Sequence, residues 1–298
     1  MGSSRRDALG AWVLASRPKT LVASVVPVAV GSALAYRDTG EFPTALFALA
    51  LLFSVLIQIG TNFSNDYFDD LRGADRDRTL APARAVSSGL ISGRTMLVAS
   101  VLMLLLAFAI GVVLMESAGA NRQLLWVGAT SVFFAIGYTG GPFPLAYNGL
   151  GDLFVILFFG FVAVCATHYV LVVGVGAEWQ PNWIVPMGVG FSVNNLLVVN
   201  NARDYGEDRL VGKRTSVVLL GRRSGVVLYG VGVSVSTLVC PYFENGIAPV
   251  VWVFPLGLFC LLKLTKASTR KDYGLVLLTT AITILAYGCV TVWGLLAS

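Results

Sequence analysis

Four carboxylates gather in the stretch NFSNDYFDDLRGAD, which ends an otherwise apolar segment. With about 100° per helical residue, an arc of roughly 60° contains Asn62, Asp66 and Asp69. Carboxylates crowded beside apolar chain repel one another, and a hard divalent cation that prefers oxygen ligands, above all magnesium, relieves this repulsion. The alternative interpretation is a solvated acidic loop at the end of a helix.

A second copy of the pattern, NNARDYGED, follows another apolar run and places Asn200, Asp204 and Asp208 at intervals of four residues. On a helical wheel the two aspartates share an arc of roughly 100°, and Arg203 is expected to point the other way. If the two segments pack side by side, their carboxylates can hold two or more magnesium ions. The usual ligand shared by such ions is a diphosphate.

The composition indicates that these acids belong to an integral membrane protein. Of the 298 residues, 56% are hydrophobic and 12% are charged, and the mean hydropathy is +0.77. A soluble domain of this size cannot bury so much apolar surface. Runs near the ~20 residues that a bilayer requires predict an all-α polytopic protein with nine transmembrane helices. The expected ranges are about 20–36, 43–64, 95–115, 122–140, 150–174, 183–201, 215–240, 248–264 and 274–296.

The distribution of basic residues predicts the orientation of these helices. With a cytoplasmic N-terminus, all of the 21 Lys and Arg residues except Arg37 and Arg122 fall in inside loops and ends, as the positive-inside rule requires. Both acidic motifs then lie at the cytoplasmic face, and the chain is expected to lie in the cell membrane. The net charge of +5 fits this topology and an anionic substrate, and the interleaved acids argue against nucleic-acid binding.

Cations near the motifs are candidates for binding an anion. Arg17 and Lys19 open the first predicted helix, where they either anchor to lipid headgroups or attract an acidic substrate. Lys213 follows the second motif closely and can serve as a point charge for phosphate. The basic loop after the first motif, RDRTLAPARAVSSG, is long enough to be a lid, although a loop that only sets topology has the same composition.

Two further features of the chain have simpler interpretations. The connection YTGGPFPLAYNGLGD contains no Lys or Arg, and its Gly, Pro and aromatic content suits a rigid cap. Asp152 closes it at a helix start, where an acid stabilises the helix dipole. His168, the only histidine, is expected on the outer side as an interhelical hydrogen-bonding residue.

At the two acidic motifs the sequence resembles the UbiA superfamily of intramembrane aromatic prenyltransferases, which carry NxxxDxxxD motifs at the ends of their second and sixth helices. The second motif is a direct match. The first can be read in two registers, as Asn62, Asp66 and Asp70, or as Asn65 and Asp69 with the last aspartate displaced to Asp75. The adjoining Gly-Ala pair favours the second register.

Within that superfamily, the first motif, the YTGGPFPLAYNGLGD connection and the segment NNARDYGEDRLVGKRT resemble the 1,4-dihydroxy-2-naphthoate polyprenyltransferases of menaquinone synthesis. The resemblance implies one transmembrane domain over 1–298. Two four-helix halves, about 1–145 and 146–265, and a last helix would surround a central cavity that opens to lipid. It also implies transfer of a polyprenyl chain from its diphosphate to the naphthoate, with decarboxylation, to give demethylmenaquinone.

The resemblance also implies roles for individual residues. Mg2+ is the expected cofactor, with the ligands Asp66, Asp69, Asp75, Asp204 and Asp208. Catalysis is expected of Asp69, Asp204, Asp208 and Lys213. Diphosphate binding is expected of Asn65, Arg78, Asn200 and Lys213, and binding of the aromatic acceptor is expected of Arg17, Lys19 and Tyr138. The other implied partner is the lipid bilayer, and the oligomeric state is left open.

Three alternatives remain. A related enzyme of the same superfamily could use 4-hydroxybenzoate as its acceptor. A cation transporter would explain intramembrane carboxylates, but these acids cluster at one face rather than at the midplane. A membrane CDP-alcohol phosphotransferase would also require magnesium, but the DGxxAR signature of that class is absent.

Overall fold

The computed structural model describes residues 2–75 and 79–298, with side chains from residue 9 onward. Every regular element in this part of the chain is helical, which confirms the predicted all-α class. The elements in chain order are α1 Gly2–Ser16, η1 Pro18–Thr20, α2 Val22–Thr39, α3 Thr44–Leu71, α4 Gly93–Ser117, α5 Leu124–Gly137, η2 Leu145–Tyr147, α6 Gly151–Val155, η3 Ile156–Val162, α7 Ala163–Gly174, α8 Ile184–Leu210, α9 Ser216–Leu220, α10 Ser224–Ser234, η4 Val235–Val239, α11 Cys240–Phe243, η5 Asn245–Val253, α12 Phe254–Lys266 and α13 Arg270–Ala297.

The length and hydropathy of these helices are those of a multi-pass membrane protein. Within the described residues, six helical segments are long and apolar enough to cross a membrane, and a bent pair, Leu9–Thr20 with Val22–Thr39, makes a seventh if it is one span. Each of the nine predicted segments overlaps a helix. However, α5 has only 14 residues. α8 is a continuous helix, but the asparagines within its apolar run keep its hydropathy below that of the six segments.

The N-terminal part of the chain differs from the prediction. Residues 2–16 form a helix, α1, which was not predicted because it begins with polar and charged residues and its apolar part is shorter than a membrane span. The chain then breaks at Arg17, whose φ of 52° is the only positive value at a non-glycine position among the described residues. A residue before proline is disfavoured in the right-handed α region, and Pro18 opens the short η1 turn, where its missing N–H costs nothing.

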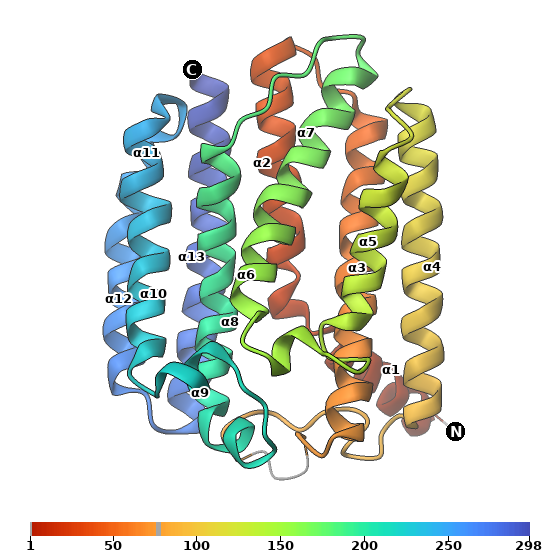
Figure 1. Cartoon of the computed structure of the whole chain (residues 1–298), viewed down its shortest axis with the longest axis vertical. Coiled ribbons are helices and arrows are strands. Elements are labelled where there is room, and N and C mark those ends of the chain that lie inside the picture. Colours follow the sequence, from red (N-terminus) through yellow and green to blue (C-terminus); the bar gives the residue numbers. More distant parts are fainter. Residues whose placement is uncertain (1, 76–78) are drawn as a thin grey trace.

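Helices that carry the acidic motifs run in the same direction through the bundle. In Figure 1, α3 and α8 both descend to the end where α1 and α9 lie, while the C-terminus is at the opposite end. A buried apolar cluster joins α2, α7, α8, α11, η5 and α13. The connections that follow α3, α5 and α8 therefore all lie at one end, beside the two motifs (Figure 1).

Close packing of η3 against α8 fixes the centre of the bundle. A Cβ added to Gly160 in η3 would lie 2.5 Å from the Pro186 carbonyl oxygen and 2.9 Å from the Gly190 Cα. Small residues let membrane helices approach this closely. η3 is a π-helical stretch of 7 residues, a feature frequently found at functional sites.

Polar side chains also cross between helices at both ends of the bundle. Asp152 lies in the first turn of α6, as predicted, and its Oδ1 accepts from Asn194 Nδ2 on α8 at 3.0 Å. At the other end, Trp179 Nε1 donates to His168 Nδ1 at 3.1 Å, so the His168 Nε2–H donates to Asp38 Oδ2 at 2.8 Å. The predicted interhelical role of His168 is confirmed.

The glycine contact between η3 and α8 makes a stability prediction. Gly160→Ala places a methyl group against the backbone of α8 and should cost about 1–3 kcal/mol, as overpacked cores do. The thermal unfolding midpoint of the purified protein in detergent measures this. Gly274→Ala is the matched control, because a Cβ there meets nothing within 4 Å. Equal midpoints for the two variants would contradict the close approach.

Candidate active site

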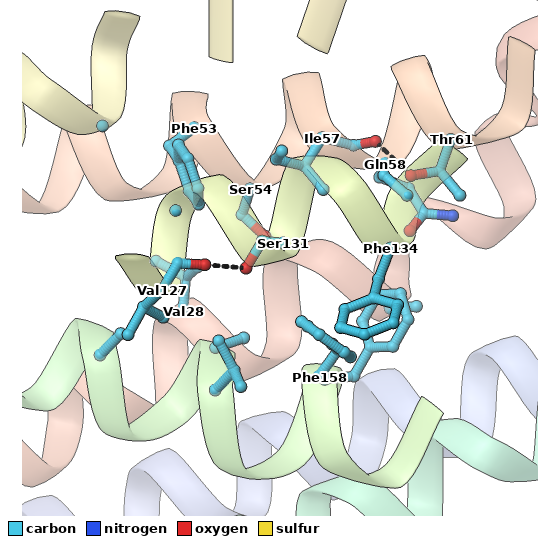
Figure 2. Close-up of a pocket in the computed structure, with 18 of the residues that line it drawn as sticks. Val28, Phe53, Ser54, Ile57, Gln58, Thr61, Val127, Ser131, Phe134 and Phe158 are labelled. Carbon is cyan, nitrogen blue, oxygen red and sulfur yellow. Dashed lines mark hydrogen bonds between the residues drawn. The ribbon is translucent and has the colours of Figure 1, made fainter. Parts of the chain in front are cut away.

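A long apolar cavity runs through the interior of the bundle. Its volume is about 300 Å³, and its lining comes from α2, α3, α4, α5, α6, η3, α7 and α8. Along α3 the wall extends from Ala50 to Asn65, which is roughly 22 Å of helix rise. Figure 2 shows the Phe134 and Phe158 rings side by side in the lining, with Val28, Phe53 and Ile57 further along the wall. Such a space suits a flexible hydrocarbon chain.

One end of the cavity is polar. The polar residues there include Arg17, Gln58, Asn62, Asn65, Tyr138 and Asn200. Asn62 Nδ2 donates to the Ser16 carbonyl at 2.9 Å, and Arg17 Nη2 donates to the Asn62 carbonyl at 3.5 Å. The break between α1 and α2 is therefore bound to α3. Backbone strain of the kind seen at Arg17 is concentrated at functional sites, and it turns this cation toward the cavity.

The two acidic motifs meet just beyond this polar end. Lys213 Nζ lies 3.7 Å from Asp69 Oδ1 and 3.7 Å from Asp208 Oδ1, so one ammonium contacts a carboxylate of each motif. Both aspartates are 5% exposed. None of the three residues is in the lining of the apolar cavity. A charged compartment thus adjoins an apolar one.

Carboxylates of the first motif also order the segment that follows it. Asp66 Oδ2 accepts from the Ala85 N–H at 3.2 Å, and Asp75 Oδ1 lies 3.7 Å from Arg84 Nε. Asp66 Oδ1 is buried and has no hydrogen-bond partner in the described part of the protein. Asp66 therefore retains one carboxylate oxygen that can take a further ligand.

In the second motif, Asp204 is paired with its neighbour in the chain. Arg203 Nε and Nη2 donate to the two oxygens of Asp204 at 2.6 and 2.7 Å. The prediction that Arg203 points away from this side chain is wrong. The wheel places only the Cα, and the long guanidinium reaches back to the adjacent carboxylate.

The connection between α5 and α6 lies against both motifs, as a cap should. Tyr147 Oη donates to Asp69 Oδ1 at 2.8 Å. Arg72 donates to the carbonyls of Thr139 and Gly141, and the Arg214 N–H donates to the Tyr147 carbonyl at 3.2 Å. Burial and the neighbouring Asp69 carboxylate raise the pKa of the Tyr147 phenol, so the hydroxyl stays protonated and is the donor. Sequence reasoning missed Tyr147 and Arg72, although the aromatic content of the connection was a signal.

Other predicted site residues line the polar end of the cavity. Asn65 Oδ1 accepts from Thr139 Oγ1 at 2.9 Å, and Asn200 Nδ2 donates to the Leu196 carbonyl at 2.9 Å. The Tyr138 hydroxyl lies close to the backbone of Gly151, where an added Cβ would be 3.0 Å away. These three side chains come from α3, α8 and the end of α5.

Two predicted site residues are not placed in this group. Lys19 is exposed on η1 and is not in the cavity lining. Arg78 belongs to 76–78, which lie outside the described residues. Directly after them, Thr79 donates to Glu207 Oε1 through its N–H at 2.6 Å and through Oγ1 at 2.9 Å. The segment after the first motif therefore extends across to α8.

The chemistry of the donors suits magnesium, although a complete cage is not formed. In the described residues, no three or more His, Cys, Asp or Glu side chains converge as a metal site. Magnesium is usually held by one or two carboxylates together with substrate phosphates and water. Asp66 Oδ1 and the carboxylate of Asp69 are hard oxygen donors of this kind. The residues present fit a metal ion that binds together with a diphosphate.

Comparison with known proteins assigns the chain to a family. A sequence model described as the UbiA prenyltransferase family matches residues 24–274. The chain belongs to this family. Among UbiA-family relatives, the 1,4-dihydroxy-2-naphthoate octaprenyltransferase of Haemophilus influenzae is 33% identical over 78% of this chain and 76% of its own length. The enzyme of the same name from Mycobacterium tuberculosis is 37% identical, over 73% of this chain and 72% of its own length.

Solved structures show the same fold. A UbiA homolog from Archaeoglobus fulgidus bound to GPP and Mg2+ superposes with a TM-score of 0.59. The match covers 96% of this chain and 99% of that chain, at 18% sequence identity. A digeranylgeranylglyceryl phosphate synthase superposes with a TM-score of 0.59 and 16% identity over 99% of this chain and 100% of that chain. The protein therefore has the UbiA fold.

The meeting of the two motifs predicts which carboxylates a UbiA-type reaction needs. Asp69→Ala and Asp208→Ala should each lower magnesium-dependent prenyl transfer by ~10²-fold or more, the usual effect of removing one preorganised electrostatic group. Initial rates on purified, folded variants measure this. Glu178→Ala, at an exposed acid in the connection between α7 and α8, is the control. Retention of more than roughly a tenth of the rate in either aspartate variant would contradict the assignment.

Proposed function

We propose that this chain transfers a polyprenyl group from polyprenyl diphosphate to 1,4-dihydroxy-2-naphthoate with decarboxylation, giving demethylmenaquinone in its quinol form. The observation that carries the proposal is the apolar cavity that ends beside two aspartate motifs linked by Lys213. An apolar tail and a diphosphate head require these two environments side by side. The family assignment and the names of the relatives supply the reaction class and the acceptor.

The diphosphate head belongs in the charged compartment. Lys213 already lies between Asp69 and Asp208, and its flexible stem can turn the ammonium toward phosphate oxygens. When bound, Mg2+ supplies positive charge that stabilises the leaving diphosphate. This placement supports the proposed catalytic roles of Asp69, Asp208 and Lys213. Asp204, in the second motif, is proposed to act with them, and Asp66 and Asp75 are proposed as further oxygen donors.

The prenyl tail lies along the apolar wall, and the acceptor lies at its polar end. The bond between the allylic carbon and the diphosphate oxygen breaks, and its electron pair leaves with the diphosphate. A ring carbon of the acceptor supplies the pair for the new carbon–carbon bond, and loss of carbon dioxide from the carboxylate returns a pair to the ring. The apolar lining keeps water from the allylic cation.

Groups at the polar end fit an aromatic acid. Arg17 faces the cavity and can pair with the carboxylate of the naphthoate. The Tyr138 hydroxyl, in the same lining, can hydrogen-bond to a ring oxygen. Asn65 and Asn200 lie where the diphosphate and the acceptor would meet. Lys19, exposed on η1, is better suited to drawing an anion toward the site than to holding it.

We also propose a topology of nine spans in two four-helix halves, about 1–145 and 146–265, with a last helix. The support is that each predicted segment overlaps a helix and that successive segments alternate in direction (Figure 1). We propose that the protein lies in the cell membrane with its N-terminus in the cytoplasm. Both motifs are then at the cytoplasmic face, where the basic residues concentrate. Polyprenyl diphosphate, the aromatic acceptor and the bilayer are then the partners.

Lys213 provides a test of the diphosphate site. Lys213→Ala should raise the KM for polyprenyl diphosphate about tenfold or more, because it removes a charge-assisted contact, and should leave the KM for the naphthoate nearly unchanged. Steady-state kinetics with each substrate varied in turn measure the two constants. Lys271→Ala, at an exposed lysine in the first turn of α13, is the control. Equal constants for both substrates in variant and parent would exclude this role.

The acceptor is tested directly by the fate of its carboxyl group. Purified protein given magnesium, a long polyprenyl diphosphate and carboxyl-labelled 1,4-dihydroxy-2-naphthoate should release labelled carbon dioxide and form the prenylated quinol. Prenylation of 4-hydroxybenzoate with its carboxylate retained, and no reaction with the naphthoate, would show a different acceptor. Absence of prenyl transfer, together with cation uptake into proteoliposomes, would favour a transporter.

A further inference from the structure

Tyr147 contacts three charged residues at the proposed diphosphate site from a connection that carries neither acidic motif. Its hydroxyl donates to Asp69 Oδ1 at 2.8 Å. The Arg72 Cζ lies 5.0 Å from the centroid of its ring, and the Lys213 Nζ lies 5.2 Å from the same centroid. The side chain is buried. One aromatic residue thus contacts the first motif and the lysine after the second motif.

The backbone around Tyr147 holds the ring in this position. The N–H of Tyr147 donates to the Pro144 carbonyl at 3.0 Å, and its carbonyl accepts from the Arg214 N–H. Asn148 Nδ2 also donates to the Pro144 carbonyl, at 2.8 Å. Gly149 follows with a φ of 74°, a conformation that suits glycine. Tyr147 is therefore held from both sides of the chain rather than carried on a loose loop.

The contacts of Asp69 show what this arrangement does to its carboxylate. Tyr147 Oη and Lys213 Nζ both contact Oδ1. A hydrogen bond to an ionised carboxylate is stronger than one between neutral groups, so the pair fixes the rotation of the carboxylate. With Oδ1 engaged, Oδ2 is the oxygen oriented to accept a hard cation.

The ring has a separate effect on Lys213. An ammonium near the face of an aromatic ring, within about 6 Å of its centroid, is attracted by the negative potential of that face. When the Lys213 ammonium leaves the two carboxylates for a phosphate, the ring keeps it within the site. Tyr147→Phe removes the hydrogen bond to Asp69 and keeps the ring beside the Lys213 ammonium. Tyr147→Leu removes both contacts.

We propose that Tyr147 is a positioning residue that orients Asp69 and Lys213 for the metal-bound diphosphate. The inference rests on the proposed function, because it presupposes a diphosphate between the two motifs. It adds a role for the α5–α6 connection, which becomes part of the diphosphate site and not only a cover over it. Tyr147 acts through Asp69 and Lys213 and does not need to touch the reacting carbons.

The test compares Tyr147→Phe and Tyr147→Leu with the parent. Tyr169→Phe is the matched control, because its hydroxyl accepts a hydrogen bond from the Asn121 N–H at 3.1 Å. Asn121 belongs to the connection between α4 and α5, which lies at the end of the bundle away from α9 (Figure 1). The measurements are the magnesium concentration that gives the half-maximal rate and the KM of each substrate. Binding of Mn2+ in the presence of an unreactive prenyl thiolodiphosphate, followed by electron paramagnetic resonance, gives a readout that does not depend on turnover.

Tyr147→Phe should raise the half-maximal magnesium concentration and the KM for polyprenyl diphosphate by about tenfold, the effect of losing one hydrogen bond to a charged group. Mn2+ affinity should fall by a similar factor, and the KM for the naphthoate should stay within about twofold of the parent value. Tyr147→Leu should be weaker again. In an Asp69→Asn background, Tyr147→Phe should add little to the loss of Mn2+ affinity, because the two residues act through one contact.

Unchanged Mn2+ affinity and unchanged magnesium dependence in Tyr147→Phe, with an active parent, would overturn the inference. A change confined to the KM for the naphthoate would overturn it too and would assign Tyr147 to acceptor binding. If Tyr147→Leu does not fold, Tyr147→Phe decides the question alone. If the parent protein does not prenylate the naphthoate, the proposed acceptor is wrong. The Mn2+ affinity of Tyr147→Phe, compared with that of the parent, still tests the role of Tyr147 in that case.

Discussion

Charge neutralisation at the edge of an apolar interior is the constraint on which the rest of this structure depends. Asp69 and Asp208 are buried and come from two helices far apart in the chain, and the Lys213 ammonium contacts both. Two carboxylates without a counter-charge would be costly in such surroundings. The contact requires α3 and α8 to end at the same level, which in turn fixes the directions of the helices between them.

The connections at this end of the bundle are built around carboxylates of the same two motif segments. Asp66 accepts from the backbone of Ala85, Glu207 accepts from Thr79, and Tyr147 donates to Asp69. Each contact joins a helix end to a connecting segment, and in the first two the donor is a backbone N–H that would otherwise lack a partner. The fixed conformation of these connections is therefore a consequence of placing acids next to lipid-facing helices. A metal ion with a diphosphate would bind in a region where the same carboxylates and lysine that bind it already hold the connections in place.

The sequence was sufficient for the features that depend on local patterns. Apolar runs predicted where the helices lie, and the spacing of asparagine and aspartate predicted both motifs. It was insufficient where partners are distant or the pattern is mixed. Tyr147 and Asp69 are in contact although they are 78 residues apart in the chain. The apolar run of α1, residues 8–15, is too short to predict a span. The asparagines of α8 lower its hydropathy although it runs beside the cavity. Arg203 was misplaced because a helical wheel ignores the reach of a long side chain.

The left-handed backbone of Arg17 affects how a substitution at this position changes the stability and the activity of the protein. A non-glycine residue in such a conformation stores roughly 1 kcal/mol or more of strain, which glycine would relieve. Yet glycine would also remove the guanidinium that faces the cavity. Residue 17 is thus a position where selection for thermal robustness and selection for substrate handling pull in opposite directions. The guanidinium also donates to the Asn62 carbonyl, so glycine would exchange relief of backbone strain for the loss of that contact and of turnover.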